Sequence, residues 1–190
     1  PALFERFVES ELTAALHGHC GRLLQNPVVD LSSGTEADGE DGSAGGRHRA
    51  AVGRHHAPST DPDDHISVRT GLVYEVDGDP VTTFVATYPT DRRARAAEHY
   101  RLLAACTALG VDRAYLIYPA QRRGDAPQPR RIVHTDISIV EYPVDLSEGP
   151  AQSSRAIVEL ARQARELAAE ATARRRSGAR HRTEGRRHAR

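Results

Sequence analysis

The chain has 190 residues, enough for one domain of ordinary size with a real hydrophobic core. Basic and acidic residues both number 26, so the zero formal net charge gives no overall field that would attract nucleic acid. No apolar run approaches the roughly 18 residues of a membrane span, and no charged segment followed by an apolar one marks a signal peptide. We therefore expect a soluble, cytoplasmic protein without a membrane partner.

Three features of residue usage add to this. Cys20 and Cys106 lie far apart in the sequence, so we expect a buried, reduced pair of thiols and no disulfide framework. The chain contains no Met, so we expect the natural protein to begin upstream of Pro1. It also contains no Lys, and every basic residue other than His is Arg.

The first third of the chain predicts one helix, one strand and an insertion. Residues 1–16 form an amphipathic pattern in which apolar residues recur at spacings of three and four: Leu3, Phe4, Phe7, Val8, Leu12 and Ala15. Residues 25–31 fit a short strand around Val28 and Val29. Residues 32–64 are Gly, Ser, Asp, Glu, His and Arg with almost no large apolar residue, which predicts a disordered insertion.

The middle of the chain predicts a hairpin followed by a helix. Residues 68–76 alternate as a strand with Leu72, Tyr74 and Val76 on one face, residues 77–80 form an Asp-Gly turn, and residues 81–88 form the partner strand. Asp91 is a good N-cap and Gly110 a good C-terminal stop for the next helix. We expect the inward stripe of this helix to be Ala96, Tyr100, Leu103, Ala104 and Thr107.

The last third predicts strands at 112–118, 131–136 and 138–142, with a proline-containing loop at 119–130 that argues against regular structure. A final helix over 154–173 has its apolar side chains on one face: Ile157, Val158, Leu160, Ala161, Ala164, Leu167 and Ala168. Residues 174–190 form an Arg-rich tail with one acid, Glu184, which we expect to be frayed. The element order predicts one α/β domain over 1–173, with a mixed sheet flanked by helices.

Three segments carry a resemblance to a known family. They are residues 3–8 (LFERFV), the hairpin 68–88, and the string 100–110 (YRLLAACTALG) followed by 114–118 (AYLIY). Together they resemble the C-terminal domain of the McrC family, whose members work with the GTP-driven motor McrB in modification-dependent DNA restriction. The resemblance covers about residues 2–170, without 32–64 and the tail. It implies a restriction-endonuclease-like PD-(D/E)xK fold, with DNA and an McrB-type AAA+ GTPase as partners.

The chemistry of that fold depends on a few residues. Hydrolysis of a phosphodiester needs Mg²⁺ held by carboxylates on adjacent strands, and a cation, usually Lys, near the attacking water. The resemblance places Gly71 and Val85 at the two expected acids and Thr87 at the expected Lys, while Glu5, Tyr88 and Tyr100 are retained. The family's Tyr-Gln pair on the second helix is replaced by Tyr100-Arg101.

We interpret the chain as a catalytically inactive, nuclease-like domain that binds no cofactor and is kept for DNA contact or assembly with the motor. One alternative is an active Mg²⁺-dependent endonuclease whose displaced site recruits acids such as Asp64, Glu75 or Asp77. Another is a gene remnant without function. Residues that can contact DNA phosphates are Arg92, Arg93, Arg101, Arg174, Arg175 and Arg176.

Simpler interpretations stand beside several of these residues. Glu5 fits a solvated first-turn acid favoured by the helix dipole, and Tyr88 and Tyr100 fit packing aromatics. Two His-containing groups lack the paired spacing of zinc sites: His17, His19 and Cys20, and His48, His55 and His56. The arginines of the helix and the tail equally fit solvated surfaces.

Overall fold

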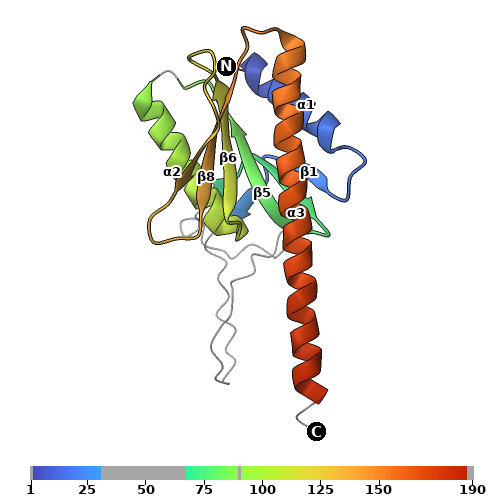
Figure 1. The fold of residues 1–190 in the computed structure, drawn as a ribbon. Helices are drawn as coiled ribbons and strands as arrows, with labels where there is room; N and C mark the ends of the chain where they lie inside the picture. The colour runs from blue at the N-terminus through green and yellow to red at the C-terminus, as the bar shows by residue number, and fades with distance from the viewer. Residues whose placement is uncertain (1, 31–66, 90, 188–190) are drawn as a thin grey trace, which may run out of the picture.

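A computed structural model describes residues 2–30, 67–89 and 91–187, with the backbone alone for 30, 92 and 176–187. It is an α/β fold with a mixed six-stranded sheet in the order β1-β4-β5-β6-β8-β7 and a separate two-stranded sheet, β2-β3 (Figure 1). The elements in chain order are α1 (Ala2–Leu16), β1 (Arg22–Gln25), β2 (Val28–Asp30), β3 (Ser67–Arg69), β4 (Leu72–Val76), β5 (Asp79–Ala86), α2 (Arg92–Leu109), β6 (Arg113–Pro119), β7 (Gln128–Arg131), β8 (Ser138–Val144) and α3 (Pro150–Arg187).

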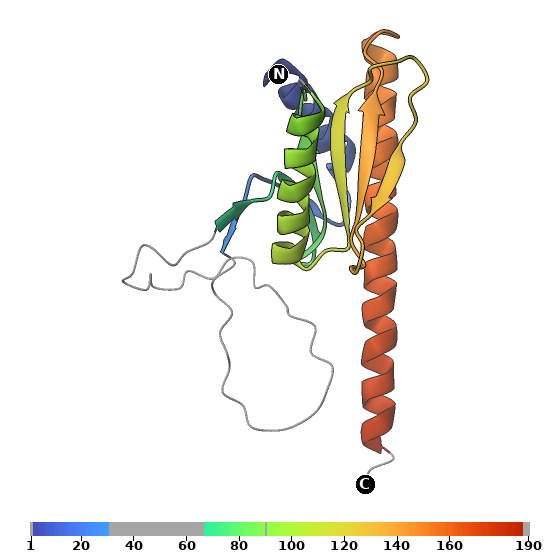
Figure 2. The same cartoon turned by 90° about the vertical axis from the view of Figure 1, so that its left-hand side faces the viewer.

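Helices cover both faces of the large sheet (Figures 1 and 2). Helices α1 and α3 pack together on one face, over a core that includes Phe4, Leu12, Tyr74, Phe84 and Leu160. Helix α2 covers the other face, over a smaller core built from residues on β4, β5, β6, β8 and α2: Val73, Val85, Leu102, Cys106, Leu109, Leu116 and Ile139. Each central strand therefore alternates between two buried faces, as strands with helices on both sides do.

The hairpin and the caps of α2 agree with the sequence. Strands β4 and β5 are antiparallel and are joined by Asp77 and Gly78, both with positive φ (56° and 82°), which is the turn that suits strand twist. The Asp91 side chain accepts a hydrogen bond of 2.7 Å from the Ala94 N–H. Gly110 closes the helix with a φ of 65°.

Several expectations from the sequence are wrong. The inward face of α2 is Leu102, Ala105, Cys106 and Leu109, whereas Ala96, Tyr100 and Thr107 of the expected stripe are exposed. The strand expected around Val28 and Val29 is confirmed as β2, but the sequence missed β1, which ends just before Asn26 with its φ of 44°. The expected strand 68–76 is divided into β3 and β4 at Gly71, which has a φ of 79°. Leu3 and Val158, expected to face inward, are exposed.

The end of the chain also differs. Residues 128–131 form the edge strand β7, where Pro129 is tolerated because an edge strand leaves one row of N–H groups unpaired. The expected strand 131–136 is instead the turn into β8. Helix α3 continues to Arg187, past the expected end at residue 173 (Figure 2). A helix that packing has already nucleated extends at little cost, and Arg and Ala are good helix formers.

Some expectations concern residues that the structure does not describe, and others are confirmed only in part. The predicted insertion 32–64, with His48, His55, His56 and Asp64, lies outside the described residues. Both cysteines are free thiols, but Cys20 is exposed and only Cys106 is buried. Burial, and after it the charge of Asp112, raises the pKa of Cys106 to about 12. Among the described residues, no helix is both long enough and apolar enough to cross a membrane.

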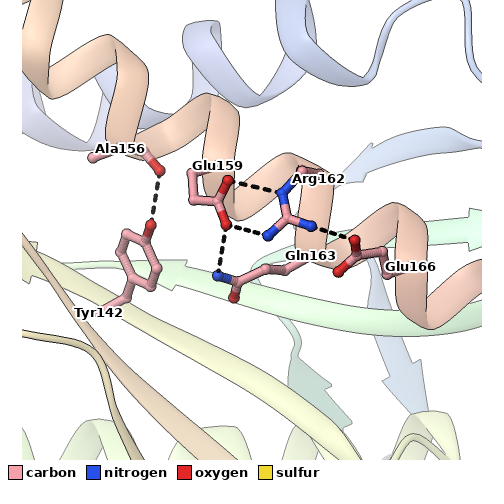
Figure 3. A network of polar contacts seen from close by, with 6 residues as sticks. All are labelled: Tyr142, Ala156, Glu159, Arg162, Gln163 and Glu166. Carbon is pink, nitrogen blue, oxygen red and sulfur yellow. Dashed lines mark hydrogen bonds and ion pairs between the residues drawn. The ribbon is translucent and has the colours of Figure 1, made fainter.

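The first half of α3, residues 150–173, packs against the sheet and carries a network of charged side chains (Figure 3). The Arg162 Nε donates to Glu159 at 2.8 Å, a second guanidinium nitrogen contacts Glu166, and the Gln163 amide donates to Glu159 at 3.4 Å. Next to them, the Tyr142 hydroxyl donates to the Ala156 carbonyl at 2.9 Å and joins β8 to the helix. The acids of this network are thus neutralised by arginine.

This network predicts an unusual titration of Glu159. Hydrogen bonds from Arg162 hold the pKa of Glu159 at about 2, below its ordinary value. A depressed pKa means that the stabilising contact is fully present above the unfolded-state pKa and is lost as the pH falls towards 2. We expect the Glu159 carboxyl carbon to titrate near pH 2 by NMR in the wild type, and near its ordinary value of about 4.3 in Arg162→Gln. An unchanged midpoint in the variant would show that Arg162 is not the cause.

Candidate functional site

The positions that the sequence assigns to the two expected acids lie side by side. Strand β4 pairs with β5 in the register Leu72–Phe84, which sets Gly71, just before β4, against the end of β5. A Cβ atom added to Gly71 would lie 2.9 Å from the Cγ2 atom of Val85. Two carboxylates at these positions would converge, which is the arrangement that a metal ion bridging adjacent strands requires.

Gly71 leaves no room for a side chain. Its φ of 79° is a left-handed conformation that favours glycine, and an added Cβ would lie 2.3 Å from the Phe84 carbonyl oxygen. The neighbouring Thr70 is fully buried, and its hydroxyl donates to the Pro27 carbonyl at 3.0 Å. The backbone here is packed against β5 too closely to accept an acid without moving.

The two positions on β5 are part of the packed structure. Val85 is buried against Leu102 and Cys106 in the core beneath α2. Just beyond the strand, the Thr87 backbone N–H donates to the Ile117 carbonyl at 2.9 Å and extends the pairing with β6. Neither side chain can ligate Mg²⁺ in the way a carboxylate does or supply a positive charge.

The retained and alternative acids do not gather at this place. Glu5 is exposed on α1, which covers the face of the sheet opposite to Val85. Glu75 is buried and bound to Arg22, and its Oε2 atom has no hydrogen-bond partner. Asp77 is exposed in the hairpin turn. Within the described ranges, no group of three or more His, Cys, Asp or Glu side chains could hold a metal ion.

The two retained tyrosines are also exposed. The exposed fraction is 53% for Tyr88 and 74% for Tyr100, so the expectation that they are packing aromatics is wrong. His17, His19 and Cys20 are exposed in the turn after α1. A nitrogen of the His19 ring contacts the Arg165 guanidinium, so this His faces a cation.

A polar cluster around the buried Glu141, which the sequence does not reveal, lies on the α2 face of the sheet. We call Glu141, His99, Arg130 and Tyr118 the Glu141 cluster. Glu141 Oε1 lies 3.1 Å from His99 Nε2 and 3.2 Å from Arg130 Nε, and its Oε2 accepts from the Tyr118 hydroxyl at 3.4 Å. The cluster joins four elements, α2, β6, β7 and β8.

Two further contacts complete this cluster. His99 Nδ1 lies 2.8 Å from the Arg95 carbonyl oxygen, so an oxygen atom faces each ring nitrogen. The Arg95 guanidinium lies 4.5 Å above the centre of the Tyr118 ring. Burial, and after it the charge of Glu141, raises the pKa of Tyr118.

The Glu141 cluster lies close to Thr87 but is not a metal site. Ala86 pairs with Ile117, and Leu116 pairs with Glu141, which places Tyr118 one strand and Glu141 two strands away from β5, with Arg130 on the edge strand β7 beyond them. Both oxygens of Glu141 already accept from donors, and arginine and histidine outnumber the single acid. The arrangement anchors α2 and the β7–β8 hairpin to the sheet. The one signal in the sequence is an acid two residues after Ile139, on the inward face of a strand.

No protein-family model, curated protein or solved structure matches the chain. The residues themselves therefore carry the functional argument.

The arginines predicted to contact DNA form two separate groups. Arg93 and Arg101 lie on α2, where Arg93 is exposed and Arg101 contacts Glu98 and the Arg69 carbonyl, both at 3.4 Å. Arg174 and Arg175 lie on α3, which covers the other face of the sheet, 3.8 Å from Asp112 and 2.6 Å from Asp79 respectively. For Arg92 and Arg176 the structure gives the backbone alone.

Proposed function

We propose that the chain is an McrC-like, restriction-endonuclease-like domain that lacks a metal centre and contributes DNA contacts to a modification-dependent restriction system. The observation that carries the proposal is the position of Gly71 beside Val85 on adjacent strands. These are the places that the family resemblance assigns to converging carboxylates, and here they hold a glycine without space for a side chain and a core valine.

The architecture supports the same proposal. The antiparallel strands β1, β4 and β5 and the parallel strand β6 belong to one mixed sheet flanked by helices, which is the coarse arrangement that the resemblance implies. The DNA contact is assigned to arginine, since the chain has no Lys. The McrB-type GTPase partner follows from the resemblance to McrC.

The proposal predicts that the purified chain does not cut DNA. With supercoiled plasmid and either Mg²⁺ or Mn²⁺, we expect no nicking above the background without metal, because two carboxylates and the cation of the hydrolytic site are replaced. We expect the same chain to bind DNA duplex with an affinity that falls steeply with salt, in the micromolar range typical of non-specific contact at moderate salt.

The Glu5→Ala variant is the matched control. Glu5 is exposed, so the substitution is expected to leave folding and DNA binding unchanged. Metal-dependent cutting that disappears in Glu5→Ala would overturn the proposal in favour of a displaced active site. Cutting that the variant retains would indicate a contaminating nuclease, which repurification would remove.

A further inference from the structure

The second half of α3 differs in kind from its packed first half. Residues 150–173 carry the helix across the sheet, where the side chains of Ile157, Leu160 and Ala164 are fully buried. The helix then continues past the end of the sheet to Arg187 (Figures 1 and 2). We call residues 174–187 the α3 extension.

The composition of the α3 extension is strongly basic. Its only acid is Glu184, and its basic residues besides His181 are Arg174, Arg175, Arg176, Arg180, Arg182, Arg186 and Arg187. In the packed half, Arg162 contacts both Glu159 and Glu166 (Figure 3). The positive charge of the helix is therefore concentrated in the part that leaves the sheet.

The base of the extension borders two hollows. They lie on either side of the Asp112–Arg174 contact, with volumes of about 290 Å³ and about 430 Å³. Asp112, Leu167 and Arg174 line both of them. Arg113 and Arg131 also line the larger hollow, but so do Asp136 and Glu170, which balance their charge, whereas Arg175 lines the smaller hollow.

We infer that the α3 extension binds the phosphate backbone of nucleic acid. The inference rests on the proposed function and names the surface that makes the DNA contact. Arginine pairs with phosphate oxygens in a bidentate way, and a basic helix that projects from a folded domain can follow a charged backbone.

The composition also favours nucleic acid over other partners. The only apolar residue of the extension is Ala179, apart from its two glycines. An amphipathic helix that binds a membrane surface or a partner helix needs an apolar face, and this segment has none. The extension can therefore attract a ligand only through its positive charge, so the ligand must be a polyanion.

The test is binding of a fluorescent DNA duplex by the full chain, followed by anisotropy over a range of salt concentrations. The variant carries Arg180→Gln, Arg182→Gln, Arg186→Gln and Arg187→Gln, since Gln keeps the helix propensity of Arg. The control removes the same charge at exposed positions away from the hollows: Arg6→Gln, Arg122→Gln, Arg123→Gln and Arg155→Gln. Circular dichroism verifies that both variants fold.

We expect the extension variant to bind at least tenfold more weakly than wild type. The slope of its affinity against salt should fall by about 0.9 for each phosphate that the variant no longer neutralises. The control is expected to bind like wild type.

The other outcomes separate this inference from the proposed function. Equal weakening by both variants, or wild-type affinity in the extension variant, would overturn the inference and leave the DNA contact elsewhere on the domain. Absence of DNA binding by the wild type would overturn both. Binding to vesicles of anionic phosphatidylglycerol in place of DNA would overturn the inference in favour of a lipid surface.

Discussion

Replacing Gly71 with Asp is expected to destabilise the protein severely and not to restore a metal ligand. The new Cβ would lie 2.3 Å from the Phe84 carbonyl oxygen and 2.9 Å from Val85 Cγ2, so β4 and β5 must separate. Overpacking costs about 1–3 kcal/mol, and burying an unpaired carboxylate adds several more. We expect the free energy of unfolding to fall by about 4 kcal/mol or more, measured by urea denaturation.

Gly78→Asp is the matched control for this substitution. Gly78 has nearly the same left-handed φ, 82° against 79°, but a Cβ added there would contact nothing within 4 Å. Asp tolerates this backbone region, so we expect a loss of only about 1 kcal/mol. If the two variants lose the same stability, backbone conformation and not crowding explains the glycine at position 71.

The consequence for function is specific. Restoring the acid at position 71 alone cannot rebuild a nuclease site on this backbone. Strands β4 and β5 lie too close together at Gly71 to admit a side chain, and their packing is part of the core. Combining Gly71→Asp with Val85→Glu and Thr87→Lys would place charges against Leu102 and Cys106. We expect such a triple variant to unfold before it cuts DNA, and a folded triple variant with Mg²⁺-dependent cleavage would refute this view.

The sequence correctly predicted those elements whose pattern of apolar and capping residues fits only one arrangement. Alternation placed Leu72, Tyr74 and Val76 on one face of β4, and the cap residues Asp91 and Gly110 correctly bounded α2. In α3 the apolar stripe is interrupted by charged side chains, which fixes its register, and all but Val158 of the expected residues are buried. These features depend on residues that are close in the sequence, so the sequence pattern is enough to predict them.

The features that failed depend on tertiary contacts. Leu102 to Cys106 are uniformly apolar, so two helical registers fit α2 equally well, and the exposed Tyr100 favoured the wrong one. The break at Gly71 follows from a positive φ angle that a continuous strand pattern hides. The Glu141 cluster joins residues as far apart as His99 and Glu141, and no spacing in the sequence brings them together.

The second large effect is expected at Glu141, the acid of this cluster. Glu141 is buried and is the common partner of His99, Arg130 and Tyr118. Its removal in Glu141→Ala leaves His99, Arg130 and the Tyr118 hydroxyl without their common partner. Breaking a buried ion pair from one side costs about 3–5 kcal/mol, and we expect the lower end because Arg130 is 57% exposed and can turn to water.

Glu148→Ala tests whether burial is the cause. Glu148 also pairs with an arginine, Arg123, at 3.1 Å, but that arginine is 81% exposed. A surface pair of this kind contributes no more than about 1 kcal/mol. The same truncation at the two sites should therefore differ by about 2 kcal/mol or more in the free energy of unfolding.

The partners of Glu141 can be separated by the same measurement. Tyr118→Phe removes only the hydroxyl at 3.4 Å and should cost less than about 1 kcal/mol, whereas His99→Ala removes the ion pair between α2 and β8. In a double-mutant cycle, His99 and Glu141 should show a coupling above about 1 kcal/mol. Additive losses at these two residues would mean that α2 is held to the sheet by the apolar contacts of Leu102, Cys106 and Leu109 alone, and that the Glu141 cluster only fills the space beside them.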